Sequence, residues 1–245
     1  MKPFLTIIAC GKSSEHLNWK ENYSLHGFDL ALLQYDEFEY TDDNSLRAEY
    51  FIQKPGMKYT LINNFYRDFP EALNYEYTLM MDDDISTSPL EIEKFFRTSK
   101  EYKFDLCQPG LSRNSYFTYE STRKIENAIY HLTPMVETMT PCFSKNIIGT
   151  AVADLSLTKT GFGWGFEALW EKQFHQGNGH SRFGGLIGVI DNVDFGHYRK
   201  VMGNESGIYK KFGSPIPDMN SLLWRFGLQW HGGSEFVTFE VKNEL

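Results

Sequence analysis

Short apolar runs alternate with longer amphipathic stretches along most of the chain. The apolar runs end at polar or glycine-containing turns and therefore predict buried strands, at residues 3–10, 29–35, 75–81, 104–108 and 186–192. The amphipathic stretches carry apolar side chains at helical spacing and predict helices, at residues 57–73, 88–102, 147–157, 168–174 and 219–226. Strands that alternate with helices indicate an α/β fold, so we expect a mixed, mostly parallel sheet flanked by helices.

The remaining segments are less regular. Residues 47–52 predict a short strand or a turn, and the polar and aromatic residues 112–122 predict a long loop. Three further segments each predict a strand, at residues 128–132, 135–139 and 236–241. The helix at 57–73 should stop near Pro70, and the strand at 104–108 should end at Pro109-Gly110. No repeat or change of composition marks a linker, so we expect residues 1–245 to form a single domain.

Composition and charge narrow the range of functions. Hydrophobic residues make up 41% of the 245 residues and charged residues 23%, which is ordinary for a soluble globular protein. The net charge of −8 argues against a nucleic-acid-binding protein, which would need a basic surface. The same negative charge disfavours docking on an anionic membrane. No stretch approaches the roughly 20 apolar residues of a membrane span, so we expect no integral membrane segment.

The cysteines indicate the compartment. Cys10, Cys107 and Cys142 are odd in number, lie far apart in the sequence and form no CxxC pair. This pattern favours free thiols in a reducing compartment over a disulfide framework or a zinc site. We therefore expect a cytoplasmic protein, with a peripheral association with the membrane left open.

Three adjacent carboxylates, Asp82, Asp83 and Asp84, directly follow the predicted strand at 75–81. Open α/β sheets bind ligands at the carboxyl ends of their strands, and clustered carboxylate oxygens suit Mg²⁺ or Mn²⁺. The alternative is structural, because Asp83 or Asp84 can cap a helix that begins near Ser88-Pro89. These residues alone leave a metal site and a helix cap equally open.

A glycine-rich loop precedes the fourth predicted helix. Gly161, Gly163 and Gly165 alternate with aromatic residues and are followed by Glu167. Trp164 in this loop can stack on a sugar ring, and Glu167 at a helix start can act as a general base. The alternative is a tight loop-to-helix junction, with Trp164 in the core and Glu167 beside the positive end of the helix. The loop alone favours this structural alternative.

Two further strand ends carry polar side chains. His197 follows the predicted strand at 186–192, and a neutral imidazole is a good ligand for Mn²⁺. A single histidine is more often a surface or core residue than a ligand, so the interpretation of His197 as a metal ligand depends on the carboxylate cluster. Gln108, Arg113 and Ser115 follow another strand end and either line a substrate pocket or form a polar loop.

The order of these motifs resembles that of glycosyltransferases with the GT-A fold. An apolar first strand with a small loop is followed by the three aspartates, by the Gly-Trp-Gly-Phe-Glu loop at 163–167 and by a His-x-Arg motif at 197–199. In more detail the chain is similar to the DUF707 family of glycosyltransferase-like proteins. The segments that carry this resemblance extend from about residue 4 to about residue 202, at 80–85, 107–109, 136–144, 163–167 and 188–191 with His197.

The resemblance implies a role for each of these positions. Asp82 and Asp84 would be the outer residues of a DxD motif that holds Mn²⁺ or Mg²⁺ against a sugar-nucleotide diphosphate, with His197 as a third ligand. Glu167 would be the general base that deprotonates the acceptor hydroxyl. The donor nucleotide would contact Ala9, Gly11, Asp36, Asp83 and Gln108. The acceptor would contact Gly163, Trp164 and Gly165.

The activity implied is metal-dependent transfer of a sugar from a nucleotide sugar, with a UDP-sugar as the first expectation. The acceptor would be a glycan or glycolipid, as in polysaccharide biosynthesis, and attack assisted by Glu167 would invert the anomeric carbon. The donor part would span about residues 1–110 and the acceptor part about 111–245. Two alternatives stay open: a metal-dependent phosphohydrolase, which clustered aspartates also serve, and a non-catalytic nucleotide- or sugar-binding module with the same fold.

Overall fold

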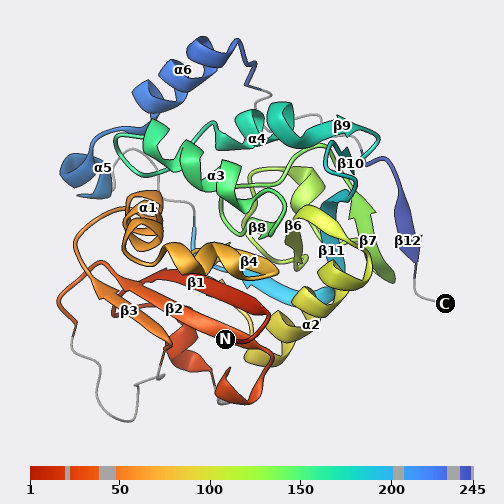
Figure 1. Ribbon diagram of the computed structural model, residues 1–245, viewed down its shortest axis with the longest axis horizontal. Coiled ribbons are helices and arrows are strands. Elements are labelled where there is room, and N and C mark those ends of the chain that lie inside the picture. The colour runs from red at the N-terminus through yellow and green to blue at the C-terminus, as the bar shows by residue number, and fades with distance from the viewer. Residues whose placement is uncertain (20–22, 39–47, 201–206, 231–237, 244–245) are drawn as a thin grey trace.

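A computed structural model describes residues 1–19, 23–38, 48–200, 207–230 and 238–243, and these residues are built around one mixed sheet (Figure 1). From edge to edge the strands follow the order β12-β7-β11-β6-β8-β4-β1-β2-β3. Their bounds are β1 Phe4–Cys10, β2 Phe28–Gln34, β3 Tyr50–Gln53, β4 Tyr77–Met81, β6 Phe104–Leu111, β7 Ala128–Leu132, β8 Cys142–Ser144, β11 Leu186–His197 and β12 Val241–Asn243. Three short strands lie off this path, β5 Ile85–Ser86, β9 His175–Gly177 and β10 His180–Ser181.

Parallel pairing dominates the N-terminal half of the sheet. Strand β1 pairs in parallel with β2 on one side and with β4 on the other, and β2 pairs in parallel with β3. Strand β8 lies antiparallel between β4 and β6, and β6 runs parallel to the long strand β11. The carboxyl ends of β1, β2 and β4 therefore lie at the same edge of the sheet, as expected for a ligand-binding α/β fold.

Helices cover both faces of the sheet (Figure 1). Helices α1 (Lys58–Asp68), α3 (Ile148–Asp154) and α4 (Phe166–Phe174) pack on one face, and α2 (Pro89–Glu101) packs on the other. Helices α5 (Gly207–Phe212) and α6 (Pro215–Phe226) follow β11, and Leu222 of α6 joins the core of the first face. The short 3-10 helices are Glu15–Asn18, Tyr23–Leu25, Pro70–Asn74, Glu120–Thr122 and Leu155–Leu157.

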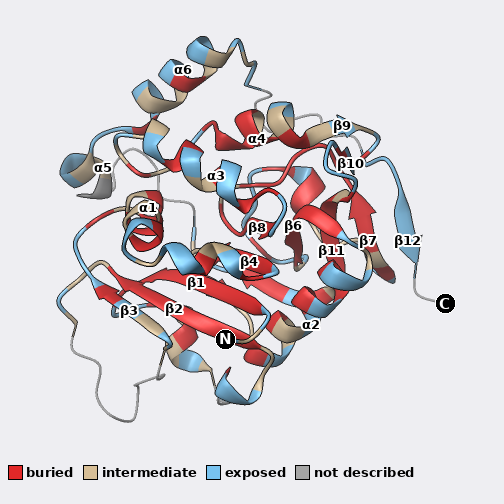
Figure 2. Ribbon diagram, viewed as in Figure 1, coloured by how far each residue is buried: buried red, intermediate tan, exposed pale blue. Residues whose placement is uncertain are grey.

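Strand β1 shows how the sequence produces this two-sided core. All its residues are buried, with Leu5 and Ile7 in the core shared with α1 and Phe4 and Ile8 in the core shared with α2. A strand covered on both faces needs a continuous apolar run and not an alternating one. Each such buried side chain stabilises the fold by about 1.5–3 kcal/mol. The same burial extends over β2 and β4 (Figure 2).

The start of α2 decides one of the open alternatives. The side chain of Ser88 accepts a hydrogen bond of 3.3 Å from the backbone N–H of Glu91, and Pro89 occupies the first turn. Ser88 is therefore the helix cap, and strand β5 separates it from Asp83 and Asp84. The interpretation of these aspartates as a cap is wrong.

Most predicted elements are present with shifted ends. Helix α1 stops at Asp68, and the 3-10 helix Pro70–Asn74 takes over the rest of the predicted helix. Helix α4 begins at Phe166, so Glu167 lies inside its first turn. Helix α6 begins four residues earlier than predicted, at Pro215. Strand β12 shares only Val241 with the strand expected at 236–241, of which residues 236 and 237 lie outside the described ranges.

Two predictions about strands are wrong. Residues 135–139 form no strand: the backbone N–H of Glu137 donates to the Gln108 side chain, and the strand β8 that pairs with β4 starts at Cys142. Strand β6 continues through Pro109-Gly110 to Leu111. Proline has no backbone N–H to donate to a neighbouring strand. It is tolerated at position 109 because β8 pairs only with Leu106 and Cys107 of β6, so no hydrogen bond to β8 is lost there.

None of the three cysteines forms a disulfide, as their spacing predicts, and all three are buried. Within the described ranges, no helix combines the length and the apolar character needed to cross a bilayer. The compartment itself stays a prediction.

Candidate functional site

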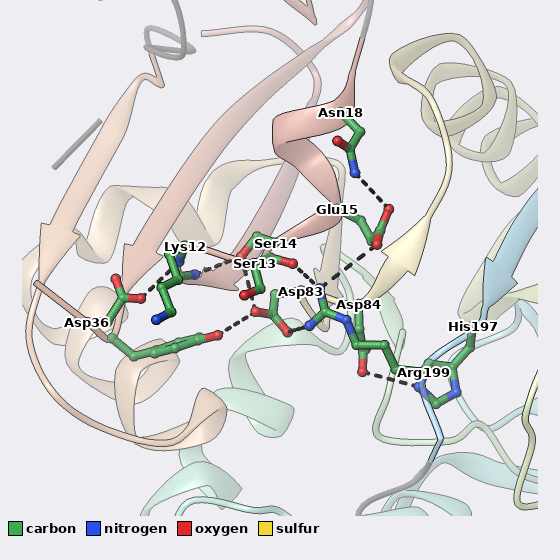
Figure 3. A network of polar contacts seen from close by, with 12 residues as sticks. Lys12, Ser13, Ser14, Glu15, Asn18, Asp36, Asp83, Asp84, His197 and Arg199 are labelled. Atoms are coloured by element: carbon green, nitrogen blue, oxygen red, sulfur yellow. Dashed lines mark hydrogen bonds and ion pairs between the residues drawn. The ribbon is translucent and has the colours of Figure 1, made fainter. Parts of the chain in front are cut away.

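The ends of four strands meet at one edge of the sheet and carry the polar residues singled out from the sequence. Ile8 of β1 is in register with Met81 of β4, so the loops that follow these strands begin side by side. The aspartates follow β4, and the short strand β5 comes directly after them and pairs with β11, where Ile85 is opposite His197. This pairing brings His197 beside Asp84 (Figure 3).

Asp84 and His197 form a carboxylate–imidazole pair at this edge. The Nε2 atom of His197 lies 3.2 Å from Asp84 Oδ2, and its Nδ1 lies 3.0 Å from the carbonyl oxygen of Tyr116. Burial opposes the charge on both groups, but their mutual attraction lowers the pKa of Asp84 and raises the pKa of His197. An Nδ1–H that donates to a carbonyl leaves Nε2 directed at the carboxylate, which is the arrangement typical of a metal-binding histidine.

Asp83 ties the neighbouring loops together. Its Oδ2 accepts hydrogen bonds from the Tyr35 hydroxyl at 2.5 Å and from the Ser14 hydroxyl at 3.1 Å. The guanidinium of Arg199 lies 3.8 Å from Asp83 Oδ1 and 3.9 Å from Glu15 Oε1, and it also donates to the carbonyl oxygen of Ser13 (Figure 3). Asp83 therefore links the loops after β1, β2 and β11, and its contact with the donor nucleotide stays a prediction.

Asp82 is paired with a lysine that sequence reasoning missed. Lys58, at the start of α1, places its Nζ 2.8 Å from Asp82 Oδ1 and also donates to the carbonyl oxygens of Thr138 and Met139. Burial lowers the pKa of Lys58, although the charge of Asp82 acts in the opposite direction. Lys58 lies on the same helical face as the buried Leu61 and Phe65, and a lysine on an apolar face is the signal that could have found it.

A divalent cation would find only part of a ligand set in this arrangement. The carboxylate of Asp84 and the imidazole of His197 converge and have the right chemistry for Mn²⁺ or Mg²⁺. Asp82 Oδ1 is engaged by Lys58, and across the described ranges no three or more His, Cys, Asp or Glu side chains stand close enough together to hold a metal ion. Asp84 and His197 fit a cation, and Asp82 would complete the set by turning away from Lys58.

The loop after β1 has the close packing expected of a nucleotide-side loop. Gly11 is closely packed: a Cβ there would lie 2.5 Å from the Tyr35 ring and 2.7 Å from Asp36 Oδ2, so these side chains would have to move. Asp36 accepts hydrogen bonds from the Lys12 backbone N–H and the Gln34 side chain. These bonds outweigh a partial burial and lower the pKa of Asp36. Ala9 is buried inside β1, and contact of these residues with a nucleoside stays a prediction.

The glycine-rich loop places Glu167 in the interior. Gly163 and Gly165 have φ angles of +79° and +94°, which favour glycine. Glu167 Oε2 accepts a hydrogen bond from the Gly165 N–H at 2.9 Å, and Oε1 accepts one from the Thr138 hydroxyl at 3.0 Å. Burial raises the pKa of Glu167 despite these bonds. Trp164 is 36% exposed, so it is not a core residue, and its ring is available for stacking on a ligand.

A second buried carboxyl, Glu137, lies close to these groups and was assigned no role from the sequence. Burial and the negative charge of Glu167 raise the pKa of Glu137 to about 7, while a hydrogen bond from Thr118 acts in the opposite direction. Its backbone N–H donates to Gln108 Oε1 at 2.7 Å, so Gln108 is buried against Glu137. The wrong strand prediction for residues 135–139 hid this group, because its neighbours Val136 and Met139 are apolar.

The fold is similar to solved glycosyltransferase structures. The 1–349 region of S. aureus TarS in complex with UDP-GlcNAc matches 91% of this chain and 64% of that chain, with a TM-score of 0.56 and 12% identity. The longer S. aureus TarS structure matches 80% of this chain and 36% of that one, with a TM-score of 0.51 and 11% identity. GalNAc-T7 with UDP, GalNAc and Mn²⁺ matches 85% of this chain and 46% of that chain, with a TM-score of 0.50 and 10% identity.

These comparisons establish the fold class. The chain has the GT-A glycosyltransferase fold, with a mixed, mostly parallel sheet between helices, as the order of the motifs predicts. The chain spans less than two thirds of the length of each of these structures. No protein-family model and no curated protein matches the sequence, so the resemblance to the DUF707 family stays a prediction.

Proposed function

We propose that this protein is a metal-dependent glycosyltransferase that moves a sugar from a nucleotide sugar to an acceptor hydroxyl. The observation that carries the proposal is the pairing of Asp84 with His197 at the carboxyl end of β4, on a GT-A fold and beside the loops that follow β1 and β2. The related folds include structures that contain UDP-GlcNAc, or UDP with Mn²⁺, which makes a UDP-sugar with Mn²⁺ or Mg²⁺ the first choice.

Asp84 and His197 would hold the metal ion, and Asp82 would join them after leaving Lys58. A divalent cation at this place neutralises the charge that develops on a diphosphate leaving group. Lys58 and Arg199 bring two further positive charges to the same edge of the sheet. The released Lys58 ammonium is suited to pairing with a phosphate oxygen, since it is no longer neutralised by the carboxylate.

The acceptor would lie between the metal ligands and helix α4. Glu167 is the proposed general base, because burial raises its pKa toward the range in which a carboxylate takes up a proton effectively. Trp164 is exposed beside it and would stack on a sugar of a glycan or glycolipid acceptor. A base on the side opposite the leaving group gives inversion at the anomeric carbon.

Ligand binding and turnover test the proposal separately. Thermal unfolding is measured with UDP, GDP, CMP and their sugar conjugates, each with MnCl₂ and with EDTA. We expect a UDP-sugar to raise the melting temperature only in the presence of the metal ion, and to release UDP during incubation. If no nucleotide shifts the melting temperature, the proposal is wrong. Binding without release of UDP over a range of acceptor sugars would instead support a non-catalytic module.

A further inference from the structure

Glu137 is a buried carboxyl whose Oε2 has no hydrogen-bond partner. Only 7% of the residue is exposed, and the other negative charges around it, on Glu167 and Asp82, repel it. A buried carboxyl oxygen without a donor destabilises a fold, because it has lost its water without gaining a replacement. The Oδ2 atom of the buried Asp154 also has no partner, so the unpaired oxygen of Glu137 is interpreted together with the place of Glu137 in the site.

Asp105, on the same strand β6 as Gln108, shows that this protein can satisfy both oxygens of a buried carboxylate. Its Oδ1 accepts hydrogen bonds from Ser144 at 2.7 Å and Asn146 at 3.2 Å, and its Oδ2 accepts one from the Gly185 N–H at 2.9 Å. Asp105 is as deeply buried as Glu137, with 2% exposure. The contrast shows that the fold can satisfy a buried carboxylate fully and does not do so at Glu137.

The chain neighbours of Glu137 place it within the transferase site. Thr138, the next residue, donates its hydroxyl to Glu167 and accepts at its carbonyl oxygen from Lys58, which is the partner of Asp82. Glu137 therefore lies where the segment passes between the metal edge and the proposed base. The charges of Asp82 and His197 both act on it, consistent with this position.

Gln108 adds a second unpartnered polar atom beside Glu137. Its Oε1 must accept from the Glu137 N–H, which fixes the orientation of the amide, and its Nε2 then has no partner. An unpartnered amide donor and an unpartnered carboxylate acceptor are the two halves of a site for a hydroxyl group. A hydroxyl donates one hydrogen bond and accepts others, so one sugar hydroxyl placed between these two atoms would satisfy both.

We propose that Glu137 and Gln108 bind a hydroxyl group of a sugar substrate in this site, with Glu137 Oε2 accepting from the hydroxyl and Gln108 Nε2 donating to it. The inference rests on the proposed glycosyltransferase function and names a contact that selects the sugar. A site built to hydrogen-bond a hydroxyl discriminates strongly against a sugar that lacks it, because both buried atoms are then left unpaired.

The variants for the test are Glu137→Gln and Gln108→Leu, with Asp154→Asn as a matched control. Asp154 is also a buried carboxyl with a raised pKa, but it lies on α3, outside the site. Glu137→Gln keeps the shape of the side chain and removes its charge, so its melting temperature should equal or exceed that of the wild type. A structural role for Glu137 would instead lower the melting temperature, which distinguishes the two.

Binding is measured by calorimetry in MnCl₂ with UDP and with UDP-glucose, UDP-galactose, UDP-GlcNAc and UDP-GalNAc. If the hydroxyl belongs to the donor, Glu137→Gln binds UDP as the wild type does and binds the preferred UDP-sugar about tenfold more weakly or worse. If the hydroxyl belongs to the acceptor, both affinities are unchanged. The variant then still hydrolyses the UDP-sugar but loses the rise in UDP release that methyl glycosides cause in the wild type.

The inference is overturned if Glu137→Gln binds UDP and the UDP-sugars, and releases UDP with and without methyl glycosides, as the wild type and Asp154→Asn do. A wild-type protein that binds neither UDP nor any UDP-sugar overturns the proposed function itself, together with this inference. The two failures are thus distinguished by the wild-type titration alone.

Discussion

The ammonium of Lys58 lies 2.8 Å from Asp82 Oδ1 and holds this carboxylate at the edge of the sheet where the other two aspartates lie. Lys58 is almost fully buried, whereas the Asp82 side chain is 38% exposed. The lysine therefore supplies the positive charge that balances the aspartates while no cation is bound. A metal ion and Lys58 would compete for Asp82.

Lys58→Gln should destabilise the metal-free protein and increase its response to Mn²⁺. Loss of the buried ammonium leaves Asp82 without a counter-charge, and the exposure of Asp82 limits the cost to about 1–3 kcal/mol. Denaturant unfolding in EDTA measures this loss, and a titration with MnCl₂ should recover more stability in the variant than in the wild type. Equal stability in EDTA would show that the pair contributes little.

Asp84→Asn and His197→Ala should each weaken metal-dependent binding of UDP by about tenfold or more, because each removes one of two converging ligands. Asp194→Asn on the same strand β11 is the matched control, since Asp194 is exposed and its backbone N–H donates to Glu91 on α2. Calorimetry of UDP binding with and without MnCl₂ checks both variants. Wild-type affinity in Asp84→Asn would exclude this pair as the metal site.

Glu167→Gln should keep donor binding and slow the transfer of sugar by about 10²–10⁴-fold, as expected for removal of a general base. The amide oxygen can still accept from the Gly165 N–H, and the amide NH2 can donate to the Thr138 hydroxyl, so the loop should keep its shape. UDP release in the presence of acceptor sugars measures the loss, with Glu171→Gln on the same helix as control. A fully active Glu167→Gln would show that another group takes the proton.

The sequence predicts the layers of this fold well because the burial of each strand and helix is visible in its own pattern of apolar residues: a continuous run for a strand covered on both faces, and one apolar face for a helix. The run at 3–10 is apolar on both faces, and the structure buries both faces of β1. The sequence does not predict the positions of His197 and Asp84 relative to each other, because the pairing of β5 with β11 joins residues more than 100 positions apart.

The two most informative buried charges were missed for opposite reasons. Lys58 was visible as a lysine among apolar helix positions, but a single long side chain on such a face often reaches solvent. Glu137 was hidden by apolar neighbours that resemble a strand, and the segment is instead fixed by the Gln108 side chain. In both cases the contact that fixes the residue, with Asp82 for Lys58 and with Gln108 for Glu137, joins segments far apart in the sequence. Local sequence patterns do not predict such contacts.

Gly163→Ala should destabilise the fold by about 2–4 kcal/mol. The φ angle of Gly163 is +79°, and a Cβ there would overlap the ring of Tyr59. Gly149→Ala in helix α3 is the control, because a Cβ there meets nothing within 4 Å. Alanine in place of an unstrained helical glycine stabilises by about 0.5–1 kcal/mol. The free energy of unfolding, measured by chemical denaturation, should therefore decrease in Gly163→Ala and increase in Gly149→Ala.

Asp154→Asn should stabilise the protein, and more so at pH 8 than at pH 5. Burial raises the pKa of Asp154 to about 6, while the hydrogen bond from Gln173 opposes this shift. A carboxyl with a raised pKa favours the folded state fully below its unfolded pKa of about 3.9, and that contribution is lost as the pH rises through 6. At pH 8 the wild type therefore bears a cost of ~1–3 kcal/mol that asparagine removes.

Urea unfolding at the two pH values measures this difference, with the exposed Asp194→Asn as control. The control should change stability little, because the Asp194 side chain is exposed. A gain for Asp154→Asn that is equal at pH 5 and pH 8 would contradict the raised pKa. The gain would then come from packing around Gln173 and not from the removal of a buried charge.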